Sequence, residues 1–151
     1  MPDARRRALL LRLPALTLGL DCALARGAGA RTLQQPAEAN HAGFMQRASE
    51  MRRRAVARGD QAYGAVLVKD GRVVGEGVSA VVVNRDPTAH AEMEAIRDAR
   101  LRLGTRDLSG CVLYGTSRAC PMCEAAAWQA GVSRMLAGDP VSDHGAPRPP
   151  G

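Results

Sequence analysis

The residues best suited to chemistry lie in two short motifs, His90-x-Glu92 and Cys120-x-x-Cys123. Two cysteines at this spacing can bind one zinc ion as thiolates, and an upstream histidine can supply a third ligand. Three protein ligands leave a fourth position for a water molecule, whose pKa falls from about 15.7 to about 7 on zinc. Glu92 lies two residues after the histidine, where its carboxylate could transfer protons. The motifs therefore predict Zn2+ as a cofactor, bound by His90, Cys120 and Cys123, with Glu92 as a catalytic residue.

Each motif alone has another interpretation. A Cys-x-x-Cys pair can be a redox couple, and an isolated histidine is more often structural. Their joint occurrence near the expected starts of two helices favours a metal site. At such positions, free backbone N–H groups and the helix dipole should favour the thiolate forms of Cys120 and Cys123. Cys111 lies apart from the pair and is interpreted as a small core residue.

The composition is that of a chain with one domain. It has 151 residues, of which 46% are hydrophobic, enough for a core of its own. Aromatic residues make up only 3%, which argues against stacking platforms for nucleic acid. The formal net charge is +6, and five arginines against two aspartates place +3 of it in residues 1–30. A nucleic-acid partner is therefore not expected, because the rest of the chain is only mildly basic.

Residues 1–30 are similar to an export signal of the twin-arginine type. An arginine run is followed by a short apolar stretch and by small residues in Ala-x-Ala spacing. The apolar stretch is far shorter than the roughly 20 residues that cross a bilayer, so no membrane span is expected. The predicted location is periplasmic; an organelle transit peptide and an extension on a cytoplasmic protein are the alternatives. Residues 31–39 form a polar connector.

Residues 40–138 have the periodicity of alternating helices and strands. Asn40 is a suitable N-cap for the first helix, and Asp70-Gly71 between two β-branched runs predicts a hairpin turn. The expected elements are a helix over 40–59, strands over 63–69 and 72–83, a helix over 88–103, a strand over 111–116, a helix over 125–130 and a strand over 132–137.

The order of these elements predicts a mixed sheet. Alternating helices and strands over residues 88–137 favour a parallel half, which joins the antiparallel hairpin. Helix starts near 88 and 120 would place His90 and Glu92 in a first helical turn, near the two cysteines of the second motif. Residues 139–151 are rich in proline and glycine and are expected to be disordered.

Residues 40–138 resemble the cytidine/deoxycytidylate deaminase zinc-binding superfamily. The segments GAVLVKDG, DPTAHAEMEAIR and CPMC are most similar to its branch of guanine deaminases and tRNA adenosine deaminases. The resemblance implies an α/β three-layer sandwich with a mixed sheet of about four strands, helices on both faces and a shortened C-terminal part. It also implies zinc-dependent hydrolytic deamination of a purine or related nucleobase or nucleoside, with release of ammonia, and a homodimer.

Three positions differ from the pattern of this branch. Arg118-Ala119 precedes the first cysteine, where the branch has Glu-Pro. Ser79 stands at the position where the branch has an asparagine that binds the base. Serine is shorter and lacks the paired donor and acceptor of an amide. Asn84 could replace that asparagine as a substrate contact, or it could cap the loop. The alternative functions are a catalytically impaired zinc-binding protein and, more weakly, a tRNA adenosine deaminase.

Overall fold

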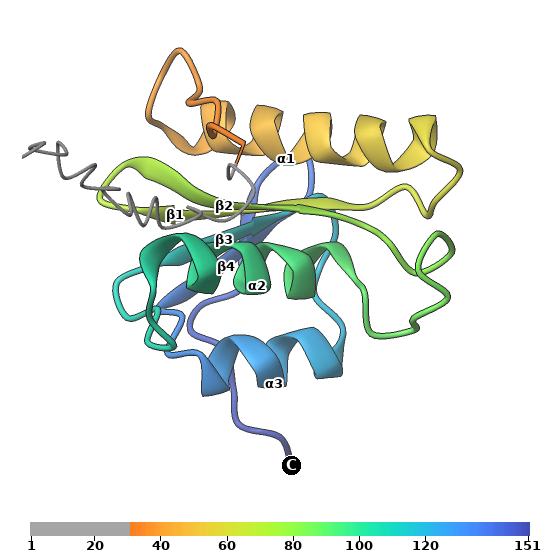
Figure 1. Cartoon of the computed structure of the whole chain (residues 1–151). Helices are drawn as coiled ribbons and strands as arrows, with labels where there is room; N and C mark the ends of the chain where they lie inside the picture. Colours follow the sequence, from red (N-terminus) through yellow and green to blue (C-terminus); the bar gives the residue numbers. More distant parts are fainter. Residues whose placement is uncertain (1–30) are drawn as a thin grey trace, which may run out of the picture.

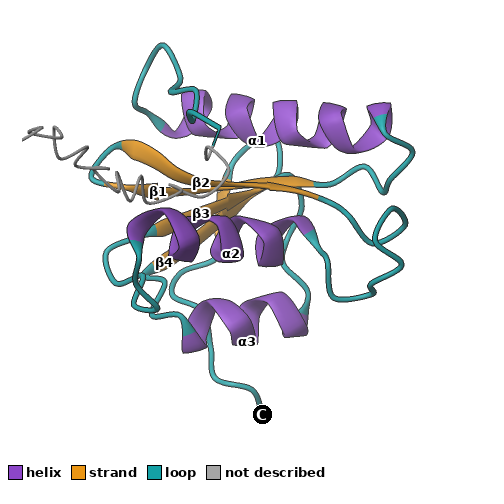
Figure 2. Cartoon of the chain, viewed as in Figure 1, coloured by secondary structure: helices purple, strands orange, loops and turns teal. Residues whose placement is uncertain are grey.

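Five strands form the middle layer of the computed structural model, which describes residues 31–151. The strands are β1 (Gly64–Lys69), β2 (Arg72–Val78), β3 (Val112–Gly115), β4 (Arg134–Ala137) and β5 (Ser142–Asp143), and their order in the sheet is β2-β1-β3-β4-β5. The helix α1 (His41–Ala57) covers one face, while α2 (Ala91–Leu103) and α3 (Pro121–Gln129) lie on the other (Figures 1 and 2). The predicted three-layer α/β fold is confirmed. The predicted export signal lies outside the described residues.

The helix α1 packs an apolar stripe against the sheet. The side chain of Asn40 accepts a hydrogen bond from the backbone N–H of Gly43 at 2.8 Å, which confirms the predicted N-cap. Phe44 and Met51 are buried against a cluster that includes Val66 and Tyr114. Within residues 31–151, no helix is both long and apolar enough to cross a membrane.

The hairpin forms as predicted, but its second strand is shorter than expected. Asp70 and Gly71 have φ values of 49° and 71°, the left-handed conformation that a tight two-residue turn requires. β2 ends at Val78, so the prediction of a strand through 83 is wrong. The backbone N–H groups of Val82 and Val83 bond to the side chain of Asp60 and not to a neighbouring strand. A side chain distant in sequence thus overrides the β-propensity of these valines.

Both site helices begin close to their motifs. α2 begins at Ala91 and not at residue 88, because Asp86 accepts hydrogen bonds from the backbone and hydroxyl of Thr88 and holds that segment in a turn. His90 is therefore the N-cap, and Glu92 lies in the first turn. α3 begins at Pro121 with Cys120 as its N-cap, which confirms the predicted helix start near residue 120. The predicted parallel half of the sheet is confirmed by the pairing of β3 with β4.

The prediction of disorder for residues 139–151 is wrong. β5 pairs with β4 in antiparallel fashion, which makes five strands where about four were expected. The backbone of Met135 exchanges two further hydrogen bonds of 2.9 Å with His144 and Gly145. Arg148 then forms an ion pair of 2.8 Å with Glu124 on α3. Backbone pairing and this ion pair fix a segment whose composition alone predicts disorder.

Side chains occupy the outward backbone groups of β2, which is one edge of the sheet. The side-chain amide of Gln35 bonds to both the N–H and the carbonyl of Val73, at 2.7 and 3.0 Å. The carboxylate of Asp98 accepts from the N–H of Glu76 at 2.9 Å. These bonds replace the partners that an adjacent strand would supply.

The backbone of α2 rests directly on two glycines of β2. A Cβ atom at Gly77 would lie 1.8 Å from the carbonyl oxygen of Ala91, and one at Gly75 would lie 2.6 Å from that of Ala95. Real Cβ atoms do not approach backbone so closely, so only glycine allows this helix-to-strand distance. The contact fixes the end of α2 that carries His90 and Glu92.

We expect the substitution Gly77→Ala to destabilise the protein by at least about 2 kcal/mol, because the methyl group would force α2 away from β2. Urea unfolding followed by circular dichroism measures the change. Arg72→Ala is the control, since Arg72 is exposed on the same strand and its loss should change stability by no more than about 0.5 kcal/mol. Equal stabilities of the two variants would contradict the close-contact argument.

Candidate metal centre and its adjoining cavity

The starts of α2 and α3 bring His90, Cys120 and Cys123 together. Their ligand atoms all lie within 4.8 Å of one another. The Nδ1 atom of His90 lies 3.7 Å from the sulfur of Cys120 and 3.6 Å from that of Cys123. Two motifs that are distant in the sequence thus meet in space as predicted.

These distances fit a tetrahedral zinc ion. With Zn–N near 2.0 Å and Zn–S near 2.3 Å, nitrogen and sulfur ligands of one tetrahedral ion lie about 3.5 Å apart. One imidazole and two thiolates are also a donor set that zinc prefers. Three ligands are the number found in catalytic zinc sites, where a position is left for water or substrate. Among the described residues, this is the group with a transition-metal donor set.

The pKa of the Cys123 thiol is shifted in the direction opposite to the one expected, since the helix start was expected to favour the thiolate. Burial raises its pKa, and the carboxylate of Glu92 and the neighbouring Cys120 raise it further. The pKa of this thiol is therefore raised although Cys123 lies in the first turn of a helix. A cation bound between the ligands would reverse this balance, because it favours the deprotonated thiol.

Glu92 lies beside the ligands and is almost completely buried. Its exposed fraction is 6%, and Oε2 lies 3.8 Å from the sulfur of Cys123. Burial raises the pKa of Glu92, while its backbone N–H, His90 and Cys123 act in the opposite direction. Gly115 lies beside this carboxylate, and a Cβ there would lie 2.9 Å from the carbonyl oxygen of Ser117 and 3.4 Å from Oε1 of Glu92. Glu92 is thus placed to hold and release a proton next to the ligand group.

A small cavity adjoins Glu92 on the same side of the sheet. Its volume is about 20 Å³, which accommodates about one water molecule. Its lining includes residues from β3, β4, α3 and the C-terminal segment. The polar lining residues are Glu92, Ser117, Arg118, Glu124, His144 and Arg148.

The structure places the two predicted substrate contacts outside this cavity. Ser79 is fully buried, and its hydroxyl donates to Oδ1 of Asp60 at 2.8 Å. Asn84 is exposed and lines a different groove, beside Arg58 and Arg97. Neither residue lines the cavity that contains Glu92. Their contact with substrate stays a prediction.

The loop before the first cysteine contributes a positive charge to the cavity. Arg118 is exposed and lines the cavity together with Ala119. Its charge helps to lower the pKa of Glu124, after the larger effect of Arg148. Sequence reasoning singled out Arg118 but missed His144 and Arg148. No local pattern points to these two residues, because their position depends on the pairing of the C-terminal segment with β4.

The fold and the His90, Cys120 and Cys123 group together are those of a deaminase-type domain with a candidate zinc site. Residues 38–139 match the family model for the cytidine and deoxycytidylate deaminase zinc-binding region. The chain therefore belongs to the cytidine and deoxycytidylate deaminase zinc-binding family, which confirms the resemblance seen in the motifs.

Relatives in this family include two kinds of deaminase. A guanine deaminase of Bacillus subtilis is 44% identical over 92 residues, 60% of this chain and 59% of that protein. A solved structure of guanine deaminase from that organism has a TM-score of 0.63 at 40% identity and covers 66% of this chain and 64% of the other. A tRNA-specific adenosine deaminase of Aquifex aeolicus is 42% identical over 83 residues, 55% of each chain.

A further solved structure was determined in complex with 2,6-diaminopurine. It has a TM-score of 0.65 at 27% identity and covers 69% of this chain and 59% of the other. The chain spans somewhat more than half the length of the curated relatives it matches.

We expect Cys120→Ser, Cys123→Ser and His90→Ala to weaken zinc binding by more than about 100-fold, because outer partners of metal ligands alone contribute about 10- to 100-fold. Elemental analysis after dialysis, together with competition against a chromogenic chelator, measures the loss. Cys111→Ser is the matched control, since Cys111 is a buried free cysteine outside the ligand group. Zinc binding that depends equally on Cys111 would contradict the assignment.

Proposed function

We propose that the protein catalyses the hydrolytic, zinc-dependent deamination of a purine or related nucleobase or nucleoside and releases ammonia, in the manner of a guanine deaminase. The observation that carries this proposal is the position of Glu92, buried within 3.8 Å of one of the converging ligands. Membership of the deaminase family and the guanine deaminase among the relatives support it.

A zinc ion held by His90, Cys120 and Cys123 would act as a Lewis acid that activates water for attack on the amidine carbon of the base. Glu92 would accept the proton that water loses on attack and pass it to the ring nitrogen. It would then take the second proton from the added hydroxyl group and transfer it to the departing amine. A C–O bond forms and the C–N bond breaks, so water and the amino compound become the carbonyl product and ammonia. A buried carboxyl with a raised pKa suits both proton transfers.

The chemistry of the lining supports a small polar ring as substrate. Glu124, His144 and Arg148 offer donors and acceptors close to Glu92. The complex with 2,6-diaminopurine shows that a related protein binds an amino-substituted base. The present cavity accommodates about one water molecule. The proposal therefore includes an outward movement of the segment that contains His144 and Arg148 when a base enters.

A second candidate function is the deamination of adenosine in tRNA. A groove of about 370 Å³ runs beside β2 and the loop that follows it, and five arginines line it together with three acidic residues. The arginines are Arg31, Arg54, Arg58, Arg97 and Arg102. The Aquifex relative is a tRNA-specific adenosine deaminase. Binding of tRNA that weakens steeply as the salt concentration rises would favour this candidate.

We expect Glu92→Gln to reduce ammonia release by about 100- to 10,000-fold while zinc content stays at the wild-type level, because only proton transfer is removed. A coupled ammonia assay with guanine, adenosine and cytidine, alongside elemental analysis, measures both quantities. Glu94→Gln is the matched control, since Glu94 lies on the same helix and forms an ion pair with Arg97 at its surface.

Two outcomes would contradict the proposed activity. Undiminished turnover in Glu92→Gln would exclude Glu92 as the proton shuttle. A wild-type protein that binds zinc and deaminates none of these compounds would favour the alternative of a catalytically impaired zinc-binding protein, with Arg118-Ala119 as the first positions to revert. The homodimer and the export of the chain stay predictions.

A further inference from the structure

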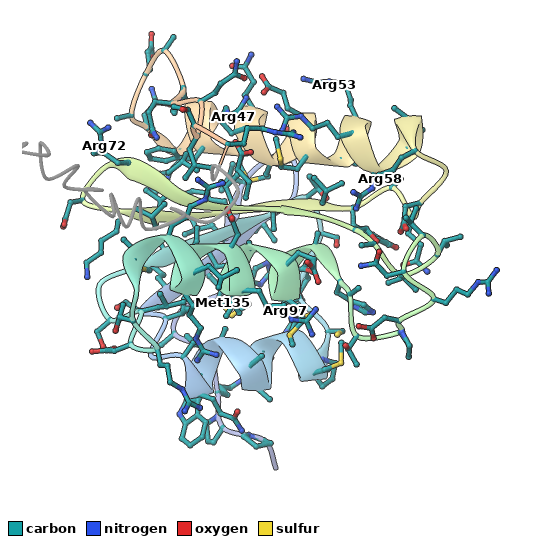
Figure 3. All side chains as sticks on the ribbon, in the orientation of Figure 1. Arg47, Arg53, Arg58, Arg72, Arg97 and Met135 are labelled. Carbon is teal, nitrogen blue, oxygen red and sulfur yellow. The ribbon has the colours of Figure 1, made fainter. Side chains whose placement is uncertain are left out.

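The segment that connects α1 to β1 forms hydrogen bonds with the loop that leads to the candidate metal centre. This connection contains Arg58 and Asp60, and the loop over residues 79–89 ends immediately before His90. Figure 3 shows Arg58 at the end of α1, on the side of the molecule where this loop lies. The two segments are distant from each other in the sequence and neither contains a proposed metal ligand.

Asp60 accepts hydrogen bonds from both ends of a turn in this loop. Its Oδ1 atom accepts from the hydroxyl of Ser79 at 2.8 Å, and its Oδ2 atom accepts from the N–H groups of Val82 and Val83 at 3.0 and 2.9 Å. The exposed fraction of Asp60 is 9%. Although burial raises the pKa of Asp60, these bonds and one from the N–H of Gln61 hold it below its usual value. The carboxylate is therefore charged at neutral pH and can accept from all four donors.

Arg58 bonds to the carbonyl groups at the start of the same loop. Its Nη2 atom donates to the carbonyl oxygen of Ser79 at 2.6 Å and to that of Val78 at 3.2 Å. Arg58 thus binds carbonyl oxygens, while Asp60 binds N–H groups and the serine hydroxyl. Together they occupy polar groups over residues 78–83 that no strand partner satisfies.

Hydrogen bonds inside the loop connect this fixed turn to the ligand histidine. The N–H of Ala80 donates to the carbonyl of Ala89, the residue before His90, at 2.9 Å. The N–H of Ala89 in turn donates to the carbonyl of Asp86 at 3.1 Å. A change in the position of Ser79 and Ala80 is therefore passed directly to the backbone that sets the direction of the imidazole.

We propose that Asp60, assisted by Arg58, is a positioning residue of the metal centre that fixes His90 through the loop over residues 79–89. The inference rests on the zinc site of the proposed function but not on turnover. Absence of deaminase activity in the wild-type protein would therefore leave it testable. It also assigns Ser79 a role as the partner of Asp60, in place of the predicted contact with a base.

The test compares Asp60→Ala with Asp107→Ala, a matched control. Asp107 also organises a turn, since it accepts bonds from the N–H and hydroxyl of Ser109, at 2.9 and 2.5 Å. That turn precedes β3 and lies outside the loop that leads to His90. Both variants lose an aspartate from a loop, but only one of these loops is hydrogen-bonded to the backbone next to a ligand.

Two readouts separate positioning from general stability. The first is the zinc Kd, measured by competition with a chromogenic chelator, and the second is the thiolate-to-cobalt absorption of the cobalt-substituted protein. Because zinc binds the folded state, a general loss of stability can also weaken apparent binding. Urea unfolding of each metal-free variant therefore accompanies the measurements, and Asp107→Ala shows how much of the change in Kd stability alone produces.

We expect Asp60→Ala to weaken zinc binding by about tenfold and to change the cobalt spectrum, as outer partners of metal ligands do. Asp107→Ala should change the Kd by less than about twofold and leave the spectrum unchanged. The zinc Kd of Asp60→Asn should lie between those of the wild type and Asp60→Ala. The amide has one carbonyl oxygen, which can keep the bonds to Val82 and Val83, but it lacks the second acceptor oxygen of the carboxylate. Arg58→Met should change both readouts in the same direction as Asp60→Ala.

A wild-type Kd and spectrum in Asp60→Ala would overturn the inference, whatever the loss of stability. If Asp60→Ala does not fold, Arg58→Met and Ser79→Ala decide the question, since each removes one part of the same set of bonds. Unchanged zinc binding and an unchanged cobalt spectrum in both of these variants would equally overturn it.

Discussion

The interaction on which the molecule depends is the burial of a carboxylate against two thiols and an imidazole. Glu92, Cys120 and Cys123 are acids that would repel one another if all were deprotonated in the interior. Burial raises the pKa of Glu92 and that of Cys123, which shifts both groups towards their protonated forms. A divalent cation would convert this unfavourable cluster into a stable one. Folding and metal binding are therefore expected to be coupled in this protein.

The architecture supplies the rigidity that such a cluster needs. His90 lies at the start of a helix whose backbone touches Gly75 and Gly77. Cys120 and Cys123 lie at the start of a neighbouring helix. Gly115, at the end of a central strand, allows the carbonyl group of Ser117 to lie close to the strand beside Glu92. Each important side chain thus stands at the end of a regular element, where backbone geometry is well determined. The loop before His90 depends in addition on hydrogen bonds from Arg58 and Asp60, which lie elsewhere in the chain.

Local patterns predicted the parts of the structure that local chemistry determines. Asp70-Gly71 defined its turn, Asn40 capped its helix, and the spacing of His90, Cys120 and Cys123 identified residues that meet in space. Two of the expectations that proved wrong depended on distant partners. Val82 and Val83 have strand-forming side chains, but their N–H groups donate hydrogen bonds to Asp60. The C-terminal segment has the composition of a disordered tail, but it pairs with β4. The sequence identifies the backbone groups that need hydrogen-bond partners, but the partners themselves depend on the tertiary fold.

The occupied edge of β2 limits how copies of this protein can assemble. Gln35 and Asp98 already bond to the outward backbone groups of Val73 and Glu76. At the opposite edge, β5 has only two residues. Short or blocked edges discourage the addition of foreign strands. Misassembly into continuous intermolecular β-structure is therefore disfavoured at both ends of the sheet, and stable self-association would have to use helical surfaces or loops.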